Sequence, residues 1–453
     1  MTDARLYRTI WRWHFYAGLF VLPFVLILAV TGSIYLFKPQ IDRWEERAFR
    51  DLGTDGAVSA DRQLAAALSS SPGSQFHHYR LAEKAGDAAM IQLGLADGRQ
   101  QEIYVSPQGR VLGSLDPDAR FSATVARLHG SLMLGKWGDW LVELAASWTI
   151  VMILTGLYMW WPRPLSLAGT AWPRLHLEGR PLLKDLHRVA GFWISGLLLL
   201  MLASGLPWAS AWGSAFKWVR TELGLIDGPQ DWKIGAAALP AHDHEHMHDR
   251  PAANQPGATT QAQAIGLPLS VFVAKAAAER MAFPVLVVAP NSPQRFGPPT
   301  GNEWTVKSET QNRPLVRSVT YDASTGDEIG RSGFADKHVV DRIVNYGIAW
   351  HEGQLFGLAN QLLGVVTALS LIALSIVGAL MWLRRRPRGE LGAPVGIASG
   401  SRPALLAAIV VLAMLLPLFG LSLLLVLLLE YSLLRRSKMV ARWLGLNSLH
   451  DAG

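Results

Sequence analysis

The residues His14–Gly32 read HFYAGLFVLPFVLILAVTG, a stretch without a charged side chain. It makes up most of the first of five charge-free runs, and about 20 apolar residues in a helix span the hydrocarbon core of a bilayer. The five runs are Phe15–Phe37, Leu144–Trp161, Val189–Phe216, Gly353–Leu383 and Pro403–Leu429. The sequence therefore predicts an integral membrane protein. The first run is too long for the apolar core of a signal peptide, so we expect it to remain as a span.

The composition limits the chemistry that the chain can carry out. Of its 453 residues, 50% are hydrophobic, only 17% are charged, and none is Cys. The absence of Cys excludes disulfides, Cys-ligated iron–sulfur clusters, Cys-type structural zinc and covalently attached c-type haem. Any redox cofactor must therefore be held by other ligands. Most of the basic residues behind the net charge of +7 lie beside the apolar runs, which favours a membrane over nucleic acid as the partner.

Basic residues mark one side of the predicted membrane. They lie before the first run, between the second and third, and after the fourth: Arg5, Arg8 and Arg12; Arg163, Arg174, Arg180, Lys184 and Arg188; and Arg384, Arg385, Arg386 and Arg388. Because short cytoplasmic segments are rich in Lys and Arg, the N-terminus is expected in the cytoplasm. Residues 38–140 and 217–352 then form two long loops on the outer side.

The fifth run allows two topologies. A single crossing would carry the basic residues that follow it to the outer side: Arg435, Arg436, Lys438 and Arg442. Pro417 and Gly420 interrupt the run near its middle. A hairpin of two short helices returns the tail to the cytoplasm and satisfies the charge rule better, although each arm is short for a full crossing.

A repeat connects the two halves of the chain. The segment His14-Phe-Tyr-Ala-Gly18 corresponds to His187-Arg-Val-Ala-Gly191, and a small hydroxyl residue followed by Gly ends 18 residues after each His, as Thr31-Gly32 and Ser204-Gly205. A second pair matches without gaps: Gly135, Gly156, Met159, Trp160 and Arg163 follow His129 at the same offsets as Gly357, Gly378, Met381, Trp382 and Arg385 follow His351. Each half is therefore predicted to be a span, an outer domain and a span, arranged as parallel repeats.

The repeat places four histidines in two predicted pairs. His14 and His187 are expected near the cytoplasmic face, and His129 and His351 near the outer face. Two axial imidazoles are a common ligand set for an electron-transfer haem, so two haems stacked across the bilayer are one interpretation. The alternative is that the histidines are amphipathic interfacial residues that duplication has copied. Ionisable residues near membrane depth favour the functional interpretation.

Charged residues near these histidines are candidate partners for a cofactor. Arg12, Arg188 and Arg127 lie close to them in sequence and are expected to pair with haem propionates. Glu352 follows His351 directly and is a candidate for orienting it or for contacting substrate. Electron transfer requires no proton-handling catalytic residue, and we predict none. The repeated glycines either allow close helix packing or leave room for a macrocycle.

The outer loops have the alternation typical of strands. Ile103–Gly113 and Val319–Gly330 each predict strand, turn and strand, with Gly109 and Gly326 in the turns. A helix over Leu269–Met281 and strands over Val285–Val288 and Trp304–Lys307 are also expected. Each loop is thus predicted to hold one small α+β unit.

The chain resembles the PepSY-associated transmembrane family of bacterial inner-membrane proteins over about residues 5–388. The residues that carry the resemblance are Trp13-His14-Phe-Tyr-Ala-Gly18, Leu128-His129-Gly130, Thr155-Gly-Leu-Tyr-Met-Trp-Trp-Pro162, Leu186-His187-Arg188, Trp350-His351-Glu352 and the two turns named above. Some members resemble dihaem ferric-siderophore reductases that act at the periplasmic face and support iron uptake. The resemblance implies two b-type haems with the four histidines as iron ligands, and two periplasmic PepSY-like domains.

The predicted fold is an α-helical membrane protein with two small periplasmic α+β domains, two parallel repeats and a C-terminal apolar helix or hairpin. The expected segments are a first span (1–37), periplasmic domain 1 (38–128), a second span (129–162), a cytoplasmic loop (163–186), a third span (187–216), periplasmic domain 2 (217–345), a fourth span (346–383), a cytoplasmic loop (384–402), a membrane hairpin (403–434) and a basic cytoplasmic tail (435–453).

One segment departs from the family pattern. His242, His244, His246 and His248 alternate with other residues in the second outer loop, ahead of a Pro-, Ala- and Gln-rich stretch that extends to about Gly266. Alternating histidines are typical of a weak, exchangeable site for a transition metal, and equally of a solvated insertion within 242–266. The metal handled by the protein is therefore not restricted to iron.

Three functions are compatible with these features. The first is a transmembrane electron carrier that reduces a ferric chelate, with quinol or a cytoplasmic reductase as the donor, since no dinucleotide-binding or Walker A motif is present. The second is a permease for the metal chelate itself. Parallel repeats favour this function, but the predicted spans contain no acidic residue, since Glu143 lies only near an edge. The third is a non-redox PepSY sensor or modulator. No role in binding nucleic acid is expected.

Overall fold

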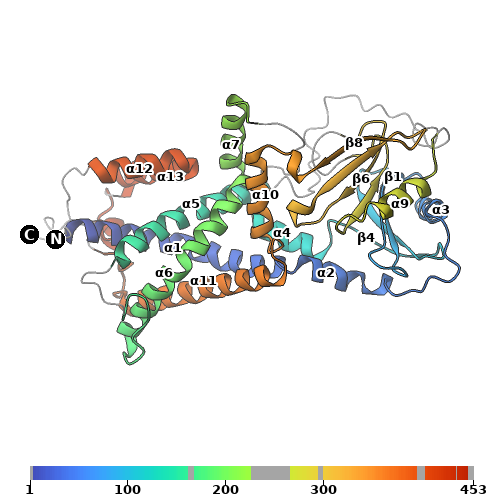
Figure 1. Cartoon of the computed structure of the whole chain (residues 1–453). Coiled ribbons are helices and arrows are strands. Elements are labelled where there is room, and N and C mark those ends of the chain that lie inside the picture. Colours follow the sequence, from blue (N-terminus) through green and yellow to red (C-terminus); the bar gives the residue numbers. More distant parts are fainter. Residues whose placement is uncertain are drawn as a thin grey trace, which may run out of the picture.

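The computed structural model describes residues 4–161, 168–225, 266–293, 299–394, 403–434 and 436–446. The chain forms a bundle of long helices with a β-sheet domain at one end (Figure 1). The N-terminus of the first helix lies at the other end of the bundle.

Four long apolar helices build the bundle: α1 (Ala4–Tyr35), α5 (Gly135–Trp160), α6 (Gly179–Gly205) and α11 (Leu358–Arg385). Each is long and apolar enough to span a membrane, as is the segment Pro417–Leu434. Helix α1 contacts α5 and α11, and α6 contacts the same two helices, so the four close into a ring. The chain is a multi-pass membrane protein, as predicted.

Several helices end earlier than the charge-free runs indicate. The third span was expected to reach residue 216, but α6 ends at Gly205, and the short helix η2 (Leu206–Trp208) separates it from α7 (Ser210–Glu222). Pro207 lacks the N–H that would continue the helix. Figure 1 shows α7 directed away from the axis of the bundle.

The two outer histidines also lie outside the long helices. The expected spans 129–162 and 346–383 are each interrupted, because His129 is in α4 (Phe121–Ser131) and His351 ends α10 (Val339–His351). Left-handed backbone terminates both segments: Leu132 has φ 52° after α4, and Gly353 has φ 71° after α10. Charge alone carries no information about these breaks, which is why the sequence-based boundaries were wrong there.

The two outer loops form one sheet instead of two separate ones. The first loop supplies α2 (Lys38–Glu45), η1 (Glu46–Phe49), α3 (Ala60–Ser70), β1 (Gln75–Arg80), β2 (Ala89–Gly94), β3 (Gln100–Val105) and β4 (Val111–Leu115). The second supplies α9 (Leu269–Ala278), β5 (Val285–Val288), β6 (Trp304–Ser308), η4 (Arg313–Leu315), β7 (Arg317–Tyr321), β8 (Glu328–Gly333) and η5 (Phe334–Asp336). The strand order is β4-β3-β2-β1-β5-β6-β7-β8. The strands predicted at β3 to β8 and the helix at α9 are confirmed.

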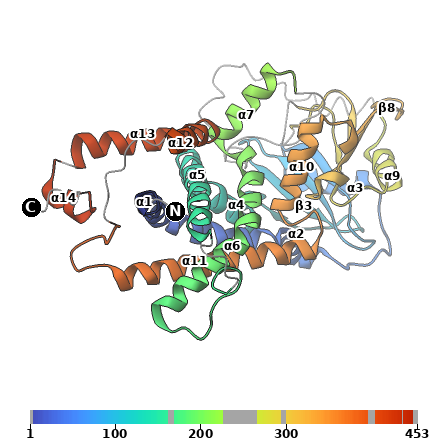
Figure 2. The same cartoon turned by 60° about the vertical axis from the view of Figure 1, so that its left-hand side comes forward.

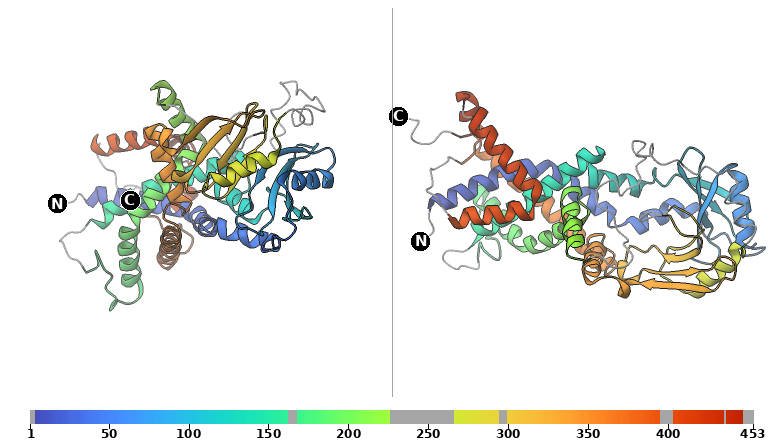
Figure 3. Two further views of the ribbon diagram at one scale, coloured as in Figure 1. Left: turned by 45° about the vertical axis from the view of Figure 1, so that its right-hand side comes forward. Right: turned by 90° about the horizontal axis from the view of Figure 1, so that it is seen from above.

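The central contact of the sheet joins the two loops. Strands β1 and β5 pair antiparallel, with Tyr79 opposite Val287. Both helices α3 and α9 contribute to a single hydrophobic core beneath the sheet, through residues such as Leu64 and Phe272. Figure 3 shows α3 and α9 beside the strands of the two loops. The outer domain is therefore one unit to which both loops contribute strands and a helix.

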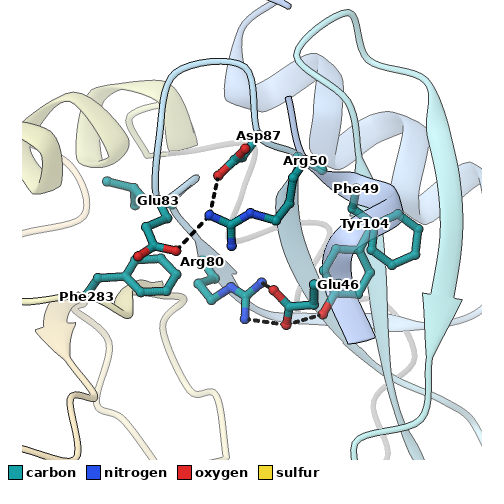
Figure 4. A pocket seen from close by; sticks show the side chains of 10 residues that line it. Glu46, Phe49, Arg50, Arg80, Glu83, Asp87, Tyr104 and Phe283 are labelled. Carbon is teal, nitrogen blue, oxygen red and sulfur yellow. Dashed lines mark hydrogen bonds and ion pairs between the residues drawn. The ribbon is translucent and has the colours of Figure 1, made fainter. Parts of the chain in front are cut away.

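A buried ion cluster joins the sheet to η1 and to the start of α4, and Figure 4 shows its members Glu46, Arg80 and Tyr104. Arg80 of β1 donates to both carboxylate oxygens of Glu46, at 3.0 and 2.7 Å. Arg120, which precedes α4, donates to Glu46 at 2.7 Å and to Glu102 of β3. Burial raises the pKa of Glu46, but Arg80 and Arg120 lower it by more, to about 2. Tyr104 donates to the same carboxylate at 2.8 Å. The cluster thus holds the starts of α4 and η1 against the sheet.

The C-terminal apolar segment reverses direction. Helices α12 (Pro403–Leu415) and α13 (Pro417–Leu429) contact each other across Leu416. A Cβ on Gly420 would lie 2.9 Å from that of Ala413, so the close approach of the helices requires glycine. Figure 2 shows α13 leading from α12 towards α14 (Lys438–Trp443).

Both ends of this hairpin meet the start of α1. Arg12 donates to the carbonyl of Pro394 ahead of the hairpin and, at 2.8 Å, to that of Gly445 behind it. Along its length the hairpin packs on α5, where the rings of Trp148 and Phe419 are 5.0 Å apart. The tail is therefore at the same end of the bundle as the N-terminus.

We predict that Arg120→Met destabilises the outer domain by about 3–5 kcal/mol, because Glu46 and Glu102 would keep buried charges with fewer partners. Amide hydrogen exchange in β3 measures this loss. Arg99→Met is the control, since Arg99 pairs with Asp97 in solvent and its loss should leave exchange unchanged. Equal exchange in both variants would contradict a stabilising role for the cluster.

Candidate functional site

The four predicted histidines meet as two pairs. The ring centroids of His14 (α1) and His187 (α6) are 6.4 Å apart, and those of His129 (α4) and His351 (α10) are 6.3 Å apart. The first pair lies towards the N-terminal end of α1, and the second lies where the bundle meets the sheet domain. The pairing expected from the sequence repeat is therefore present in the geometry.

Each imidazole rests against a glycine of a neighbouring helix. A Cβ added to Gly32 or Gly205 would lie 3.0 or 3.1 Å from the Cε1 atom of His129 or His351. Gly156 and Gly378 have the same relation to His14 and His187, at 3.2 and 3.5 Å. These four glycines are the repeated ones that end the Thr-Gly and Ser-Gly pairs or precede the Met-Trp pairs. Three of the four positions leave too little room for a side chain.

The ring nitrogen Nδ1 of each histidine faces a backbone carbonyl or a hydroxyl of the neighbouring helix that carries its cradling glycine. His14 Nδ1 lies 3.0 Å from the carbonyl of Met152, His351 Nδ1 3.0 Å from that of Met201, and His187 Nδ1 3.3 Å from that of Leu374. Each of these carbonyls belongs to the residue four positions before the cradling glycine. A carbonyl oxygen only accepts, so Nδ1 carries the proton, and Nε2 keeps the lone pair that binds metals.

A hydroxyl strengthens three of these contacts. Thr31 lies 3.0 Å from Nδ1 of His129, Ser204 lies 3.2 Å from that of His351, and Thr155 lies 3.1 Å from that of His14. Each hydroxyl donates to a carbonyl of its own helix and can therefore accept from Nδ1. Val377 holds the corresponding position beside His187, so this histidine has only the carbonyl. The two pairs thus differ in their hydrogen bonds.

Burial keeps the outer pair uncharged. Burial lowers the pKa of His129 to about 4, with a further lowering by the neighbouring His351 that the carbonyl of Leu28 opposes. Burial likewise lowers the pKa of His351, against the carbonyl of Met201. Both imidazoles are neutral at pH 7, the state that a metal ligand requires.

A cavity of about 340 Å³ surrounds the outer pair. Its walls come from all four long helices and include His129, His351, Gly32 and Gly205. The lining is mostly apolar, as is usual for a cofactor or small-molecule site of this size. Trp208 lies in the same wall, with its ring edge-on to His351 at 5.7 Å.

Charged side chains also line this cavity. Glu143 accepts hydrogen bonds from the backbone N–H groups of Ala211 and Trp212 at the start of α7, and Asp139 accepts from Ser210. These two carboxylates are therefore used to fix α7. Glu352 is only 6% exposed, lines the cavity as well, and has a buried Oε2 without a hydrogen-bond partner.

The three predicted propionate partners do not line the outer cavity. Arg127 donates to Thr124 at 3.2 Å and is not among the residues that line the cavity. Arg12 donates to the C-terminal tail, and Arg188 donates to the carbonyl of Trp160 at 3.0 Å. The basic residue that does line the outer cavity is Arg313 of η4, which the sequence analysis did not identify. A 3₁₀ turn between two strands carries no sequence signal for such a role.

The predicted metal site in the second outer loop falls outside the part of the chain that the structure describes. His242, His244, His246 and His248 lie outside the described residues. Within the described ranges, no group of three or more His, Asp or Glu side chains is placed to hold a metal ion. The two imidazole pairs are thus the metal-ligand candidates in that part of the chain.

Comparison with known families matches residues 11–385 to the PepSY-associated TM region. The match covers most of the chain, so the protein belongs to this family of membrane proteins. No curated protein matches the chain.

We predict that alanine destabilises the protein at two cradling glycines but not at a glycine without a neighbour. Gly32→Ala and Gly205→Ala should lower the thermal unfolding temperature, because the new Cβ forces a His ring to move, at a cost of about 1–3 kcal/mol. Gly196→Ala is the control in α6, since nothing lies within 4 Å of its Cβ position. It should be neutral or stabilising by up to about 1 kcal/mol, because alanine favours the helix. A similar destabilisation at all three positions would argue against the His–Gly contacts.

Proposed function

We propose that this protein is a bacterial inner-membrane electron-transfer protein with two b-type haems, which reduces ferric iron, held as a ferric-siderophore, at the periplasmic face and so supports iron uptake. The observation that carries the proposal is the presence of two facing imidazole pairs at different depths of one helical bundle. In this proposal the N-terminus is cytoplasmic, the halves are parallel repeats, and quinol or a cytoplasmic reductase donates the electrons.

The separation of the rings within each pair would allow both imidazoles to bind one metal ion. A metal–nitrogen bond of about 2.0 Å places an imidazole centroid roughly 3 Å from the metal, so two opposed rings are expected roughly 6 Å apart. The separations of 6.4 and 6.3 Å agree with this expectation. Two protein ligands are too few for a bare structural or catalytic metal, which usually has three or four, but they complete a haem whose macrocycle supplies the rest.

The residues around each pair fit the same group. Hydrogen bonds at Nδ1 direct Nε2 of each ring away from its own helix contact, and such outer partners fix ring orientation at metal sites. Glycines beneath the rings let the helices approach. A haem bound at each pair would supply one-electron redox chemistry without a proton-handling side chain. His14 and His187 are the proposed inner ligands, and His129 and His351 the proposed outer ones.

In this proposal, reduction releases the metal from its chelate. Ferrous iron binds hard oxygen ligands more weakly than ferric iron, so one electron loosens a siderophore complex. The outer pair lies beside the sheet domain, which supports delivery of electrons on the periplasmic side. The family match is compatible with this role but does not specify it.

We predict that the detergent-purified protein contains two b-type haems per chain. Dithionite should produce sharp α and β bands, and His14→Ala and His351→Ala should each remove one haem, because each breaks one pair. Haem is quantified per chain by its pyridine adduct. The matched control is His176→Ala, since His176 is solvent-exposed and should leave both haems in place. Protein expressed with ample haem that lacks a Soret band would refute the proposal and favour a permease or sensor.

We also predict reciprocal shifts in the reduction potential of the inner haem. A hydroxyl that accepts from Nδ1–H makes imidazole a stronger donor and favours the ferric state. Val377→Thr should therefore lower the midpoint potential, and Thr155→Val should raise it. Spectroelectrochemical titration measures both, and the outer haem provides the internal reference. Shifts of the same sign in the two variants would contradict the proposed hydrogen-bond effect.

A further inference from the structure

Arg313 is the basic residue among the described residues that line the outer cavity. It begins the short helix η4 of the outer domain, and η4 contacts α10, the helix that ends at His351. Arg313 therefore reaches the cavity from the sheet domain, next to one of the two imidazoles. The residues of α4 that line the same cavity beside His129, Ala126 and Gly130, have no charge.

The positive charge of Arg313 has no counterpart in the described part of the protein. Its Nε is buried without a hydrogen-bond partner, and no ion pair involving its guanidinium is formed there. The carboxylates of Asp139 and Glu143 are engaged at the start of α7. Glu352 also lines the cavity, but it lies beyond ion-pair distance of Arg313. Arg313 as a residue is partly exposed, and a partly buried charge without a protein partner favours an anionic ligand at this site.

The polarity of the cavity orients such a ligand. The part within the bundle is lined by apolar side chains such as Val25, Leu198 and Leu371, whereas Arg313 comes from the outer domain. A ligand with one apolar and one anionic edge would place the anionic edge at Arg313. The planar guanidinium matches the two oxygens of a carboxylate, with which it forms paired hydrogen bonds.

We propose that Arg313 binds a carboxylate of the ligand that occupies the outer cavity. The proposal rests on the proposed function for the identity of that ligand: the carboxylate belongs either to a haem propionate or to a carboxylate-bearing ferric chelate. Arg313 thereby takes the role that the sequence assigned to Arg127.

The test compares Arg313→Gln and Arg313→Lys in the full-length protein. Arg342→Gln is the matched control, because Arg342 also has a buried Nε without a partner but does not line the cavity. One arm measures the midpoint potential of the outer haem in a His14→Ala background, which removes overlap with the inner haem. The other arm measures the dissociation constant of ferric citrate by tryptophan fluorescence, beside a tris-hydroxamate chelate that has no carboxylate.

A propionate partner predicts a lower outer potential in Arg313→Gln, because loss of a nearby positive charge disfavours the reduced state. A tenfold shift in the reduction equilibrium corresponds to about 59 mV for one electron. Arg313→Lys should restore most of the lost midpoint potential, and Arg342→Gln should leave the midpoint potential unchanged. A carboxylate from the substrate predicts an unchanged potential and a roughly tenfold weaker binding of ferric citrate alone.

Two results would overturn the inference. The first is an unchanged potential together with unchanged binding of ferric citrate in Arg313→Gln. The second is an equal change in Arg342→Gln, which would indicate a general effect on the fold. A wild-type protein without haem would refute the proposed function, while the ferric citrate arm would still decide the role of Arg313.

Discussion

The hydrogen bond from each imidazole Nδ1–H to a neighbouring helix is the contact on which the site depends. It is possible only where a glycine lets the ring lie against the backbone, so the Cε1 atoms of His129 and His351 come within about 3 Å of where a Cβ would be. The carbonyl that accepts already accepts an intrahelical N–H, and its second lone pair receives the imidazole. The four-residue spacing between the accepting carbonyl and the cradling glycine therefore determines the position of the ring, its tautomer and the direction of Nε2. The same arrangement joins α1 to α4 and α5, and α6 to α10 and α11, so the contacts that form the pairs also hold the ring of helices together.

The outer pair additionally depends on the sheet domain. His129 and His351 sit at the ends of α4 and α10, which are connected to the long helices by residues with left-handed backbone. The start of α4 is fixed by Arg120 in the buried ion cluster, and α10 is fixed by the ion pair between Arg220 and Asp341, whose side chains are both 2% exposed. Charges buried in this way are costly unless paired, so they favour one arrangement of the helices. The histidines of the inner pair instead lie within continuous helices, and the buried Asp185, two residues before His187, pairs with Arg174.

The sequence predicted the long helices, six of the eight strands and the pairing of the histidines, because these follow from charge-free length, alternation and a repeat of fixed spacing. It did not predict where α6 ends or that α4 and α10 are separate, since breaks inside apolar runs arise from single left-handed residues and Pro207. Continuity of the sheet through β1 and β5 is a long-range contact without a local signal. Arg127 stays a predicted propionate partner, but it does not line the described cavity, because proximity in sequence to His129 does not determine the direction of a helical side chain. Arg313 reaches the cavity from a distant turn.

The differences between the two halves are as informative as their likeness. Where the halves agree, at the histidines and cradling glycines, the residues touch the imidazoles and have little freedom. Where they differ, the change alters charge or hydrogen bonding without altering ring position: Gly130 against Glu352, and Thr155 against Val377. Each pair takes one histidine from each half, so this divergence makes the surroundings of the two imidazoles within a pair unlike each other. Arg313, which the second outer loop brings to the described cavity wall, adds such a difference at the outer pair, because groups around a metal-binding imidazole tune the site without replacing the ligand.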